Sequence, residues 1–284
     1  PVVEVSIDGP PATLADVILR VGEALRRHAE PGPTPVAMLQ PVTGITIDGD
    51  VADWPGDAAP YPVAFTNPDD DRPTGPSDLQ AVFMAGYDEA AGCMYVAVVA
   101  ADQSQVVEGR GDAAYYDTYD GCEVYLWLEA GPLTGGYQWA LWGRGLFHYT
   151  SVGGLWRPPG SREPEPQWEG TSQVEARRTP GRQVYEWRID VEQLTRDRVV
   201  LKPQVELGLD VAVCDRDADG SFAWVAWGPG VEKLRHRERM GRALLLSADQ
   251  TPAAATAQAS AVAQTEFAKS LDLVRQRTAY QMFL

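Results

Sequence analysis

The strongest constraint on the fold is a long run of short alternating segments over residues 36–247. Within it, apolar and polar residues alternate over short stretches rich in Val, Tyr, Trp and Phe, and clusters of Gly, Pro, Asn and Asp separate the stretches. A period of two is typical of strands that bury one face. We therefore expect strands at 36–40, 44–47, 61–66, 78–87, 93–101, 121–129, 136–142, 145–152, 172–178, 183–189, 205–214, 221–227 and 242–246, with a helical turn only at 191–194. Many short strands with turns between them predict a mainly β fold, an antiparallel sandwich or barrel.

The segments on either side of this run have helical spacing instead. Apolar residues recur every three or four positions at Leu14, Val17, Ile18, Val21 and Leu25, and again at Phe267, Leu271, Val274, Thr278 and Met282. The sequence thus predicts an N-terminal extension with an amphipathic helix and a Pro-rich link (1–35), a β-sandwich (36–247) and a long C-terminal amphipathic helix (248–284). Two alternatives stay open for the apolar stripes: they dock on the sandwich, or they pair with each other or with a second copy, as in a homodimer.

Charge and hydropathy exclude several classes of protein. The chain has 24 Lys+Arg and 40 Asp+Glu, a formal net charge of −16, and no basic cluster, so it would be repelled by nucleic acid. The longest apolar run, 93–101, is far shorter than the ~20 residues of a membrane-spanning helix. We expect any membrane attachment to use segments outside this chain. Because the sequence begins without Met or an apolar leader, we expect a fragment or a processed product.

Cysteine use gives little sign of a disulfide framework. Cys93, Cys122 and Cys214 are isolated from one another, and each lies within an apolar alternating run. An odd number allows one disulfide at most. We expect all three to be buried free thiols.

Five stretches of the predicted strands and turns match family motifs. They are ITIDGDVADW (45–54), MYVAV with a following Asp (94–102), DGCEVYL (120–126), YEWRI (185–189) and LDVAVCDRD (209–217). In this order they resemble the family 9 carbohydrate-binding-module-like (CBM9-like, DOMON-related) sandwiches, over roughly residues 44–246. The resemblance implies a β-sandwich, a non-catalytic binding role, and a structural position for Trp54. It leaves the ligand open, because the superfamily also contains haem-binding and sensor domains.

Strand alternation indicates candidate ligand-binding residues. Glu123, Tyr125 and Trp127 share one face of the 121–129 strand, and Glu186 and Arg188 share the polar face of the 183–189 strand. If these residues line a concave face, the charged groups can hydrogen-bond a sugar-like ligand and the aromatic rings can stack on it. The alternative is a solvated sheet face with interstrand salt bridges.

A Pro-rich segment at 153–170 holds two further tryptophans, Trp156 and Trp168. Loops at the end of a sandwich commonly form the rim of a ligand site, so we expect these rings to stack on a ligand. The alternative is that they only anchor the loop.

The segment after the 205–214 strand has the spacing of a cation-binding loop. Asp215, Asp217 and Asp219 alternate, and Gly220 is the sixth residue. Carboxylates at such spacing suit calcium, which takes six to eight oxygen ligands. The loop is not an EF-hand, because Ala226 occupies position twelve. The alternative is an Asx-rich hairpin turn.

Known catalytic motifs are missing: there is no Gly-x-Ser-x-Gly, no His-Glu-x-x-His and no phosphate-binding loop. We therefore expect a non-catalytic, extracytoplasmic domain that binds a small polar ligand or glycan. The first hypothesis is the sensor domain of a membrane-anchored bacterial signalling protein such as a sensor histidine kinase. The alternatives are a secreted carbohydrate-binding module of a glycoside hydrolase and a b-type haem domain, for which Met84, Met94 and His148 are the candidate axial ligands.

Overall fold

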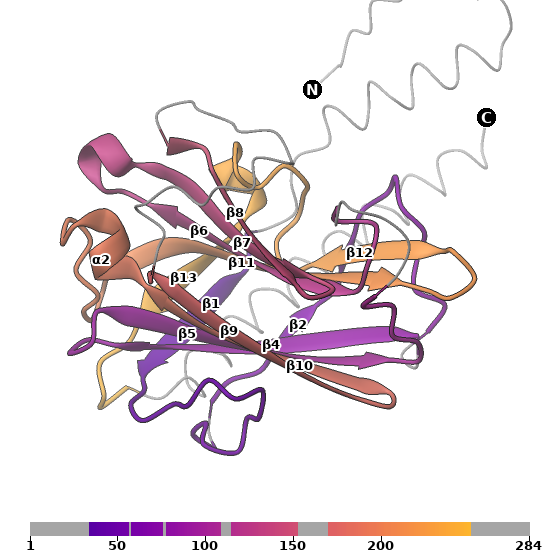
Figure 1. The fold of residues 1–284 in the computed structure, drawn as a ribbon. Coiled ribbons are helices and arrows are strands. Elements are labelled where there is room, and N and C mark those ends of the chain that lie inside the picture. The colour runs from indigo at the N-terminus through magenta and orange to yellow at the C-terminus, as the bar shows by residue number, and fades with distance from the viewer. Residues whose placement is uncertain (1–33, 57, 76–77, 109–114, 153–169, 251–284) are drawn as a thin grey trace, which may run out of the picture. The chain divides into compact units, whose positions relative to one another are not determined.

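The structure is a computed structural model that describes residues 34–56, 58–75, 78–108, 115–152 and 170–250 (Figure 1). The helices expected within 1–35 and 248–284 lie outside the described residues. Trp156 and Trp168 lie outside them as well. Among the described residues, no helix has the length and apolar character needed to cross a membrane.

Strands dominate the described residues, as the alternation predicts. They are β1 (Val36–Pro41), β2 (Tyr61–Val63), β3 (Phe65–Thr66), β4 (Leu79–Asp88), β5 (Cys93–Asp102), β6 (Gly121–Leu128), β7 (Gly135–Trp142), β8 (Gly145–Thr150), β9 (Ser172–Thr179), β10 (Arg182–Asp190), β11 (Glu206–Arg216), β12 (Phe222–Ala226) and β13 (Gly241–Leu245). The helical elements are short: η1 (Gly131–Leu133), α2 (Val191–Thr195) and η4 (Arg237–Arg239). The mainly β fold is confirmed.

Two of the expected strands differ from the structure. Residues 44–47 form no strand, because the Thr46 amide donates to Asp53 Oδ2 at 2.7 Å rather than to a neighbouring strand. Ile45 and Ile47 are nevertheless buried, so an extended segment lying on a sheet produces the same alternation as a strand. The 61–66 segment is divided between the two layers, because β2 pairs with β4 and β3 pairs with β12.

The strands form one curled sheet that folds over on itself as a sandwich (Figure 1). The order is β8-β7-β6-β11-β13-β1-β4-β5-β10-β9. The first five strands make one layer, the last four make the other, and β1 joins them. The expected antiparallel pairing holds along this path except at β1, which pairs in parallel with both β13 and β4. Long connections through the rest of the domain make this parallel pairing feasible.

The inner faces of both layers meet in one hydrophobic core. Val124 and Leu126 of β6 and Val98 and Trp187 of the other layer are fully buried there. Each layer also carries a covered cluster on its outer face. On the β6–β7–β11 outer face this cluster includes Trp142, Trp224 and Met240, and on the β5–β10 outer face it includes Ile45, Trp54 and Tyr95. All three cysteines are buried free thiols, as expected.

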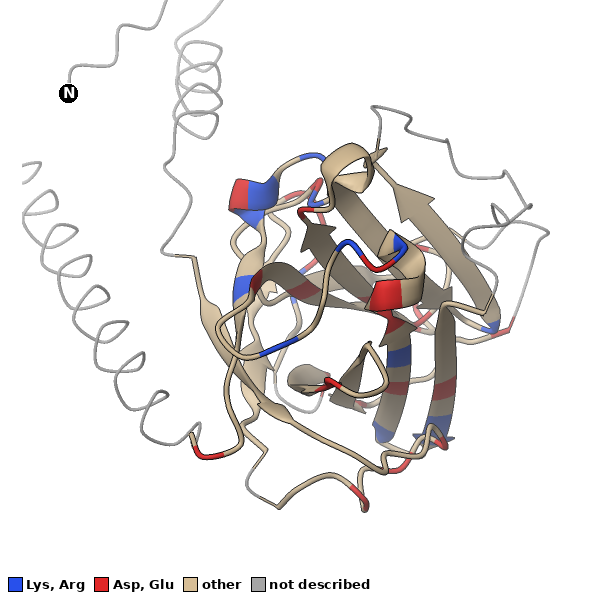
Figure 2. Cartoon of the chain, turned by 90° about the vertical axis from the view of Figure 1, so that its left-hand side faces the viewer, with Lys and Arg blue, Asp and Glu red and all other residues tan. Residues whose placement is uncertain are grey.

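Charged residues of both signs are interspersed over the strands and loops. Figure 2 views the molecule from the side of α2 and shows Lys and Arg positions lying among Asp and Glu positions rather than gathered by sign.

Candidate ligand-binding site

The predicted ligand-binding residues do not share one face. Glu123, Tyr125 and Trp127 lie on the β6–β7–β11 outer face, whereas Glu186 and Arg188 lie on the β5–β10 outer face, at the other side of the sandwich. Each strand buries its alternate residues in the common core, so the polar faces of the two layers must point away from each other. The expectation of a single polar face is therefore wrong.

The hydrogen bonds of Glu186 hold parts of the protein together. It is fully buried, and its Oε2 accepts the amides of Asp48, Gly49 and Asp50 at 3.1, 2.8 and 3.2 Å. Its Oε1 accepts Trp54 Nε1 at 2.8 Å. The carboxylate thus fastens the turn before Trp54 to β10, and Trp54 is the buried structural residue that the family resemblance implies.

Arg188 interacts with residues of its own layer, among them Tyr95 of β5 and Asp190 of β10. Its guanidinium lies 3.5 Å from the Asp190 carboxylate, at the end of β10. Glu186 and Arg188 therefore belong to a different layer of the sandwich from Glu123.

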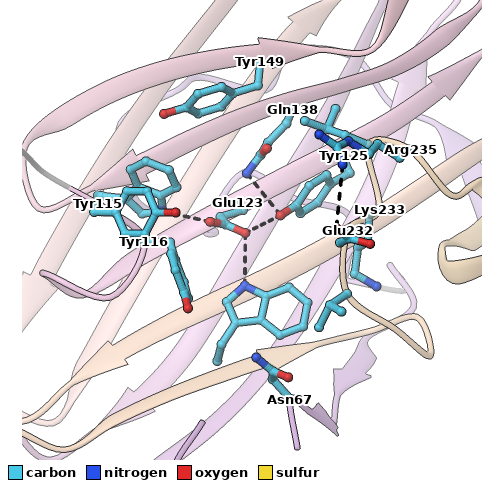
Figure 3. A pocket seen from close by; sticks show the side chains of 14 residues that line it. Asn67, Tyr115, Tyr116, Glu123, Tyr125, Gln138, Tyr149, Glu232, Lys233 and Arg235 are labelled. Carbon is cyan, nitrogen blue, oxygen red and sulfur yellow. Dashed lines mark hydrogen bonds and ion pairs between the residues drawn. The ribbon is translucent and has the colours of Figure 1, made fainter. Parts of the chain in front are cut away.

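Glu123 and Tyr125 line a cavity of about 510 Å³ on the β6–β7–β11 outer face (Figure 3). Its walls come from β6, β7, β8 and β12, from the segment before β6, and from the loop between β12 and β13. The lining residues are Asn67, Tyr115, Tyr116, Glu123, Tyr125, Gln138, Trp142, Tyr149, Trp224 and residues 231–235. The volume is within the ~300–1,000 Å³ of small-molecule sites.

The Glu123 carboxylate is the centre of this cavity's hydrogen bonds (Figure 3). It is 1% exposed. Oε2 accepts Tyr125 OH at 2.5 Å and Trp224 Nε1 at 3.1 Å, and Oε1 accepts Trp142 Nε1 at 2.9 Å. Burial raises the pKa of Glu123, and these donors oppose that shift. Because three ring donors converge on it, Glu123 holds the polar edges of three aromatic side chains in place.

The aromatic rings form a continuous wall. The ring of Trp142 lies 5.9 Å from Tyr149, 5.0 Å from Phe147 and 6.4 Å from Tyr115, measured between centroids. Tyr115 in turn lies 5.0 Å from Tyr116 and is 42% exposed. Since the indole N–H groups point to Glu123, the wall presents aromatic surface to the cavity.

A buried ion pair fastens the loop between β12 and β13 that closes one side. Lys233 Nζ donates to Asp210 Oδ2 at 2.8 Å and to the carbonyls of Gly228 and Arg239 at 3.0 Å. Asp210 also accepts the amides of Gly228 and Gly241 at 3.1 Å. Both side chains are fully buried. Burial raises the pKa of Asp210 and lowers the pKa of Lys233, and the hydrogen bonds and opposite charges of the pair oppose both shifts.

The structure brings two of the three predicted metal residues together, Asp215 and Asp217, and does not group Asp219 with them. Asp219 is exposed and accepts the amide and hydroxyl of Ser221 at 2.9 and 2.6 Å, as the hairpin-turn alternative predicts. Asp217 accepts the same hydroxyl at 3.1 Å. Asp215, in contrast, is buried and belongs to β11 itself.

Asp215 lies in a cluster of carboxylates made of Asp217 and of residues from distant parts of the chain. Its oxygens are within 4.8 Å of those of Asp78 and Asp217, and also within 4.8 Å of those of Asp102 and Asp120. Burial and the neighbouring carboxylates raise the pKa of Asp215 to about 8. Burial, with the charge of Asp102, also raises the pKa of Asp120 to about 7.

Comparisons with solved structures identify the fold. A family 9 carbohydrate-binding module from Caldicellulosiruptor kristjanssonii in complex with glucose superposes with a TM-score of 0.54 at 12% identity, over 75% of this chain and 96% of that chain. The same organism's module with cellotriose gives 0.52 at 13%, over 75% and 94%. A putative carbohydrate-binding protein from Bacteroides uniformis gives 0.52 at 12%, over 75% and 100%. The chain has the CBM9-like β-sandwich fold. No protein-family model matches the sequence, and a comparison with curated proteins finds no match.

Sequence reasoning missed most of the residues that line the cavity of this CBM9-like sandwich. Gln138 and Trp142 lie on β7 opposite Tyr125 and Gly121 of β6. The alternation of 136–142 puts them on one face, which is a usable signal, but only the pairing of β6 with β7 places that face beside Glu123. Tyr115 and Tyr116 precede the strand and carry no periodic signal.

The other candidates lie apart from this cavity. Trp127 is partly buried and packs against the outer cluster without lining the cavity. Met94 is in the sandwich core, whereas Met84 packs on the β5–β10 outer face, so the two methionines do not share a face.

Proposed function

We propose that this CBM9-like sandwich binds a sugar in the cavity around Glu123, without catalysis. The observation that carries the proposal is the set of aromatic rings whose polar edges are tied to one buried carboxylate. Pyranose rings stack their C–H faces on aromatic surface, while their hydroxyls need hydrogen-bonding groups. The cavity offers both kinds of surface.

The lining residues divide into organising and contacting groups. Glu123 already accepts three ring donors, so we assign it the task of orienting the rings. The exposed ring of Tyr115 is available for stacking. At the rim, Arg235 and Glu232 are about half exposed and lie 3.9 Å apart. Charged groups of this kind form strong hydrogen bonds with sugar hydroxyls.

The fold comparison guides the choice of ligand. Structures with this fold contain glucose and cellotriose. Fold alone does not establish function, so these two sugars are test ligands rather than assignments.

Titration calorimetry with glucose and cellotriose, after a glycan array run with calcium and with chelator, tests the proposal. Tyr115→Ala should weaken binding by about 5–30-fold, the equivalent of ~1–2 kcal/mol for one lost aromatic contact. Leu146→Ala is the matched control, because Leu146 is 41% exposed and lies outside the cavity lining. Absence of binding to any glycan would refute sugar binding, and equal affinities for the two variants would refute this cavity as the site.

We further propose that the domain works outside the cytoplasm, as the sensor domain of a membrane-anchored bacterial signalling protein such as a sensor histidine kinase. Its support is the amphipathic helix predicted on each side of the sandwich. The alternative is a secreted module of a glycoside hydrolase. The gene sequence distinguishes the two: apolar spanning segments flanking this chain support the sensor, and an adjoining hydrolase domain overturns it.

A further inference from the structure

The charged side chains that line the cavity around Glu123 have partners of opposite charge, except Glu123 itself. Glu232 lies 3.9 Å from Arg235. Lys233 donates to Asp210 at 2.8 Å, and this pair has no net charge wherever its proton lies. Within the described part of the chain, no Lys, Arg or His forms an ion pair with Glu123. The lining therefore contains one carboxylate without a cationic partner.

The hydrogen bonds of Glu123 favour its charged form over the neutral acid. The indole N–H groups of Trp142 and Trp224 can only donate. Gln138 Nε2 donates to Tyr125 OH at 3.1 Å, which leaves the Tyr125 proton for Glu123. Burial raises the pKa of Glu123, and the donors from Tyr125, Trp142 and Trp224 lower it. A cation in the cavity would favour the carboxylate further, because opposite charges attract strongly away from water.

The aromatic rings of the cavity are of the kind that attracts cations. The faces of Trp and Tyr rings carry negative potential, and a cation within ~6 Å of a ring centroid is stabilised by it. The Trp142 ring lies 5.9 Å from Tyr149 and 6.4 Å from Tyr115, so these three rings line one side of the cavity together (Figure 3). Lys233 Nζ lies 5.7 Å from the centroid of Trp224, so that ring already has a cation beside it. The other three rings remain for a ligand.

The size and polar groups of the cavity favour an organic cation over a metal ion. Among the described residues, the groups of side chains close enough together to hold a metal ion do not include Glu123. The cavity has a volume of about 510 Å³, far more than a metal ion needs. The amide groups of Asn67 and Gln138 also line it, and amides both donate to and accept from hydroxyl groups. A hydroxylated ligand that carries one positive charge fits these features.

We propose that the sugar bound in this cavity is an amino sugar, whose ammonium group lies against the rings of Tyr115, Trp142 and Tyr149. This inference rests on the proposed sugar binding in the same cavity, and it narrows the ligand from neutral sugars to cationic ones. Glu123 supplies the compensating negative charge from behind the rings. It does not need to touch the ammonium group, because charges interact over several ångströms in the protein interior.

Titration calorimetry of the full chain at pH 6 with glucosamine, glucose and N-acetylglucosamine tests the role of the charge. The amine of glucosamine is protonated at this pH. Glucose has a hydroxyl group in its place, and N-acetylglucosamine keeps the nitrogen without the charge. We expect glucosamine to bind ~5–30-fold more tightly than either neutral sugar, which is the range for a cation against aromatic rings in a largely desolvated site.

Two matched pairs of variants assign this preference to the cavity. Tyr149→Leu should reduce the ratio of glucosamine affinity to glucose affinity by ~2–5-fold, because one of three rings is lost. Trp127→Leu removes a ring from the same outer face, outside the lining, and should keep the ratio. Glu123→Gln should reduce the ratio by at least ~3-fold. Glu129→Gln makes the same change of charge on an exposed side chain and should keep it. If Glu123→Gln does not fold, Tyr149→Leu decides.

The outcomes separate this inference from the proposed function. Equal affinities of the wild type for glucosamine and glucose, or an unchanged ratio in Tyr149→Leu, would overturn the cationic ligand and leave sugar binding intact. If none of the three sugars binds and the glycan array is also negative, both proposals are overturned. Choline, a cation without a sugar ring, is the last probe. If choline binds as tightly as glucosamine while glucose does not bind, the ligand is not an amino sugar.

Discussion

At the residue scale, the Glu123 carboxylate accepts hydrogen bonds from three aromatic side chains, Tyr125, Trp142 and Trp224. Glu123→Gln replaces an acceptor oxygen with an amide NH₂ group, which faces N–H and O–H donors. We expect a loss of ~2–4 kcal/mol in the free energy of unfolding, because buried donors are left without an acceptor. Urea unfolding measures it. Glu129→Gln, with 75% of its side chain exposed, should change stability by less than ~0.5 kcal/mol. Equal stability of the two variants would contradict this role of Glu123.

His148 should make stability depend on pH. Burial lowers its pKa from 6.5 to about 4. Between these values the unfolded chain binds the proton and the folded chain does not, so the stability contribution is present at neutral pH and is lost as pH falls. When the pH falls from 7 to 4.5, the free energy of unfolding of the wild type should decrease. The decrease should be ~1–2 kcal/mol smaller in His148→Gln, with allowance for the partial exposure of the side chain. Unfolding curves at both pH values measure this, and parallel losses would contradict it.

At the scale of elements, the loop between β12 and β13 depends on the Lys233–Asp210 pair. Lys233→Met leaves Asp210 buried without its counter-ion, so we expect a loss of ~3–5 kcal/mol in unfolding free energy. Combination with Asp210→Asn should restore part of it. The exposed Lys202→Met is the control and should stay within ~0.5 kcal/mol. A loss below ~1 kcal/mol in Lys233→Met would show that the loop is held mainly by other contacts.

Sequence patterns predicted where the strands lie in the chain, but they did not predict which strands and residues lie side by side in the fold. Alternation identified β6 and β10 and the inner and outer face of each, because the side-chain period is local. It could not show that these outer faces point in opposite directions, since layer assignment depends on contacts between residues far apart in sequence. The same limit explains the metal residues. The Asp215–Asp219 spacing is visible in the sequence, whereas Asp78 reaches Asp215 only through the folded sandwich.

For the whole molecule, the predicted terminal helices are open to a direct test. Circular dichroism of a 34–250 fragment should show strand with little helix, and the full chain should add a helical signal at 222 nm. Sedimentation of both species then separates the alternatives for the apolar stripes: a dimer of the full chain alone indicates pairing between copies. A full chain with no more helical signal than the fragment would contradict the helices.

The parallel pair of β1 and β13 determines how the domain responds to tension. Val36 pairs with Arg242 and Leu39 with Leu245, so the chain enters the pair at one end and leaves it at the other. The amide of Arg242 donates to the Pro35 carbonyl at 2.9 Å, and the amide of Leu246 to the Leu39 carbonyl at 2.8 Å. A force pulling residues 34 and 250 apart acts along the strands and loads these hydrogen bonds in shear, all at once rather than one after another. The sandwich should therefore transmit force between its two flanking segments before it yields.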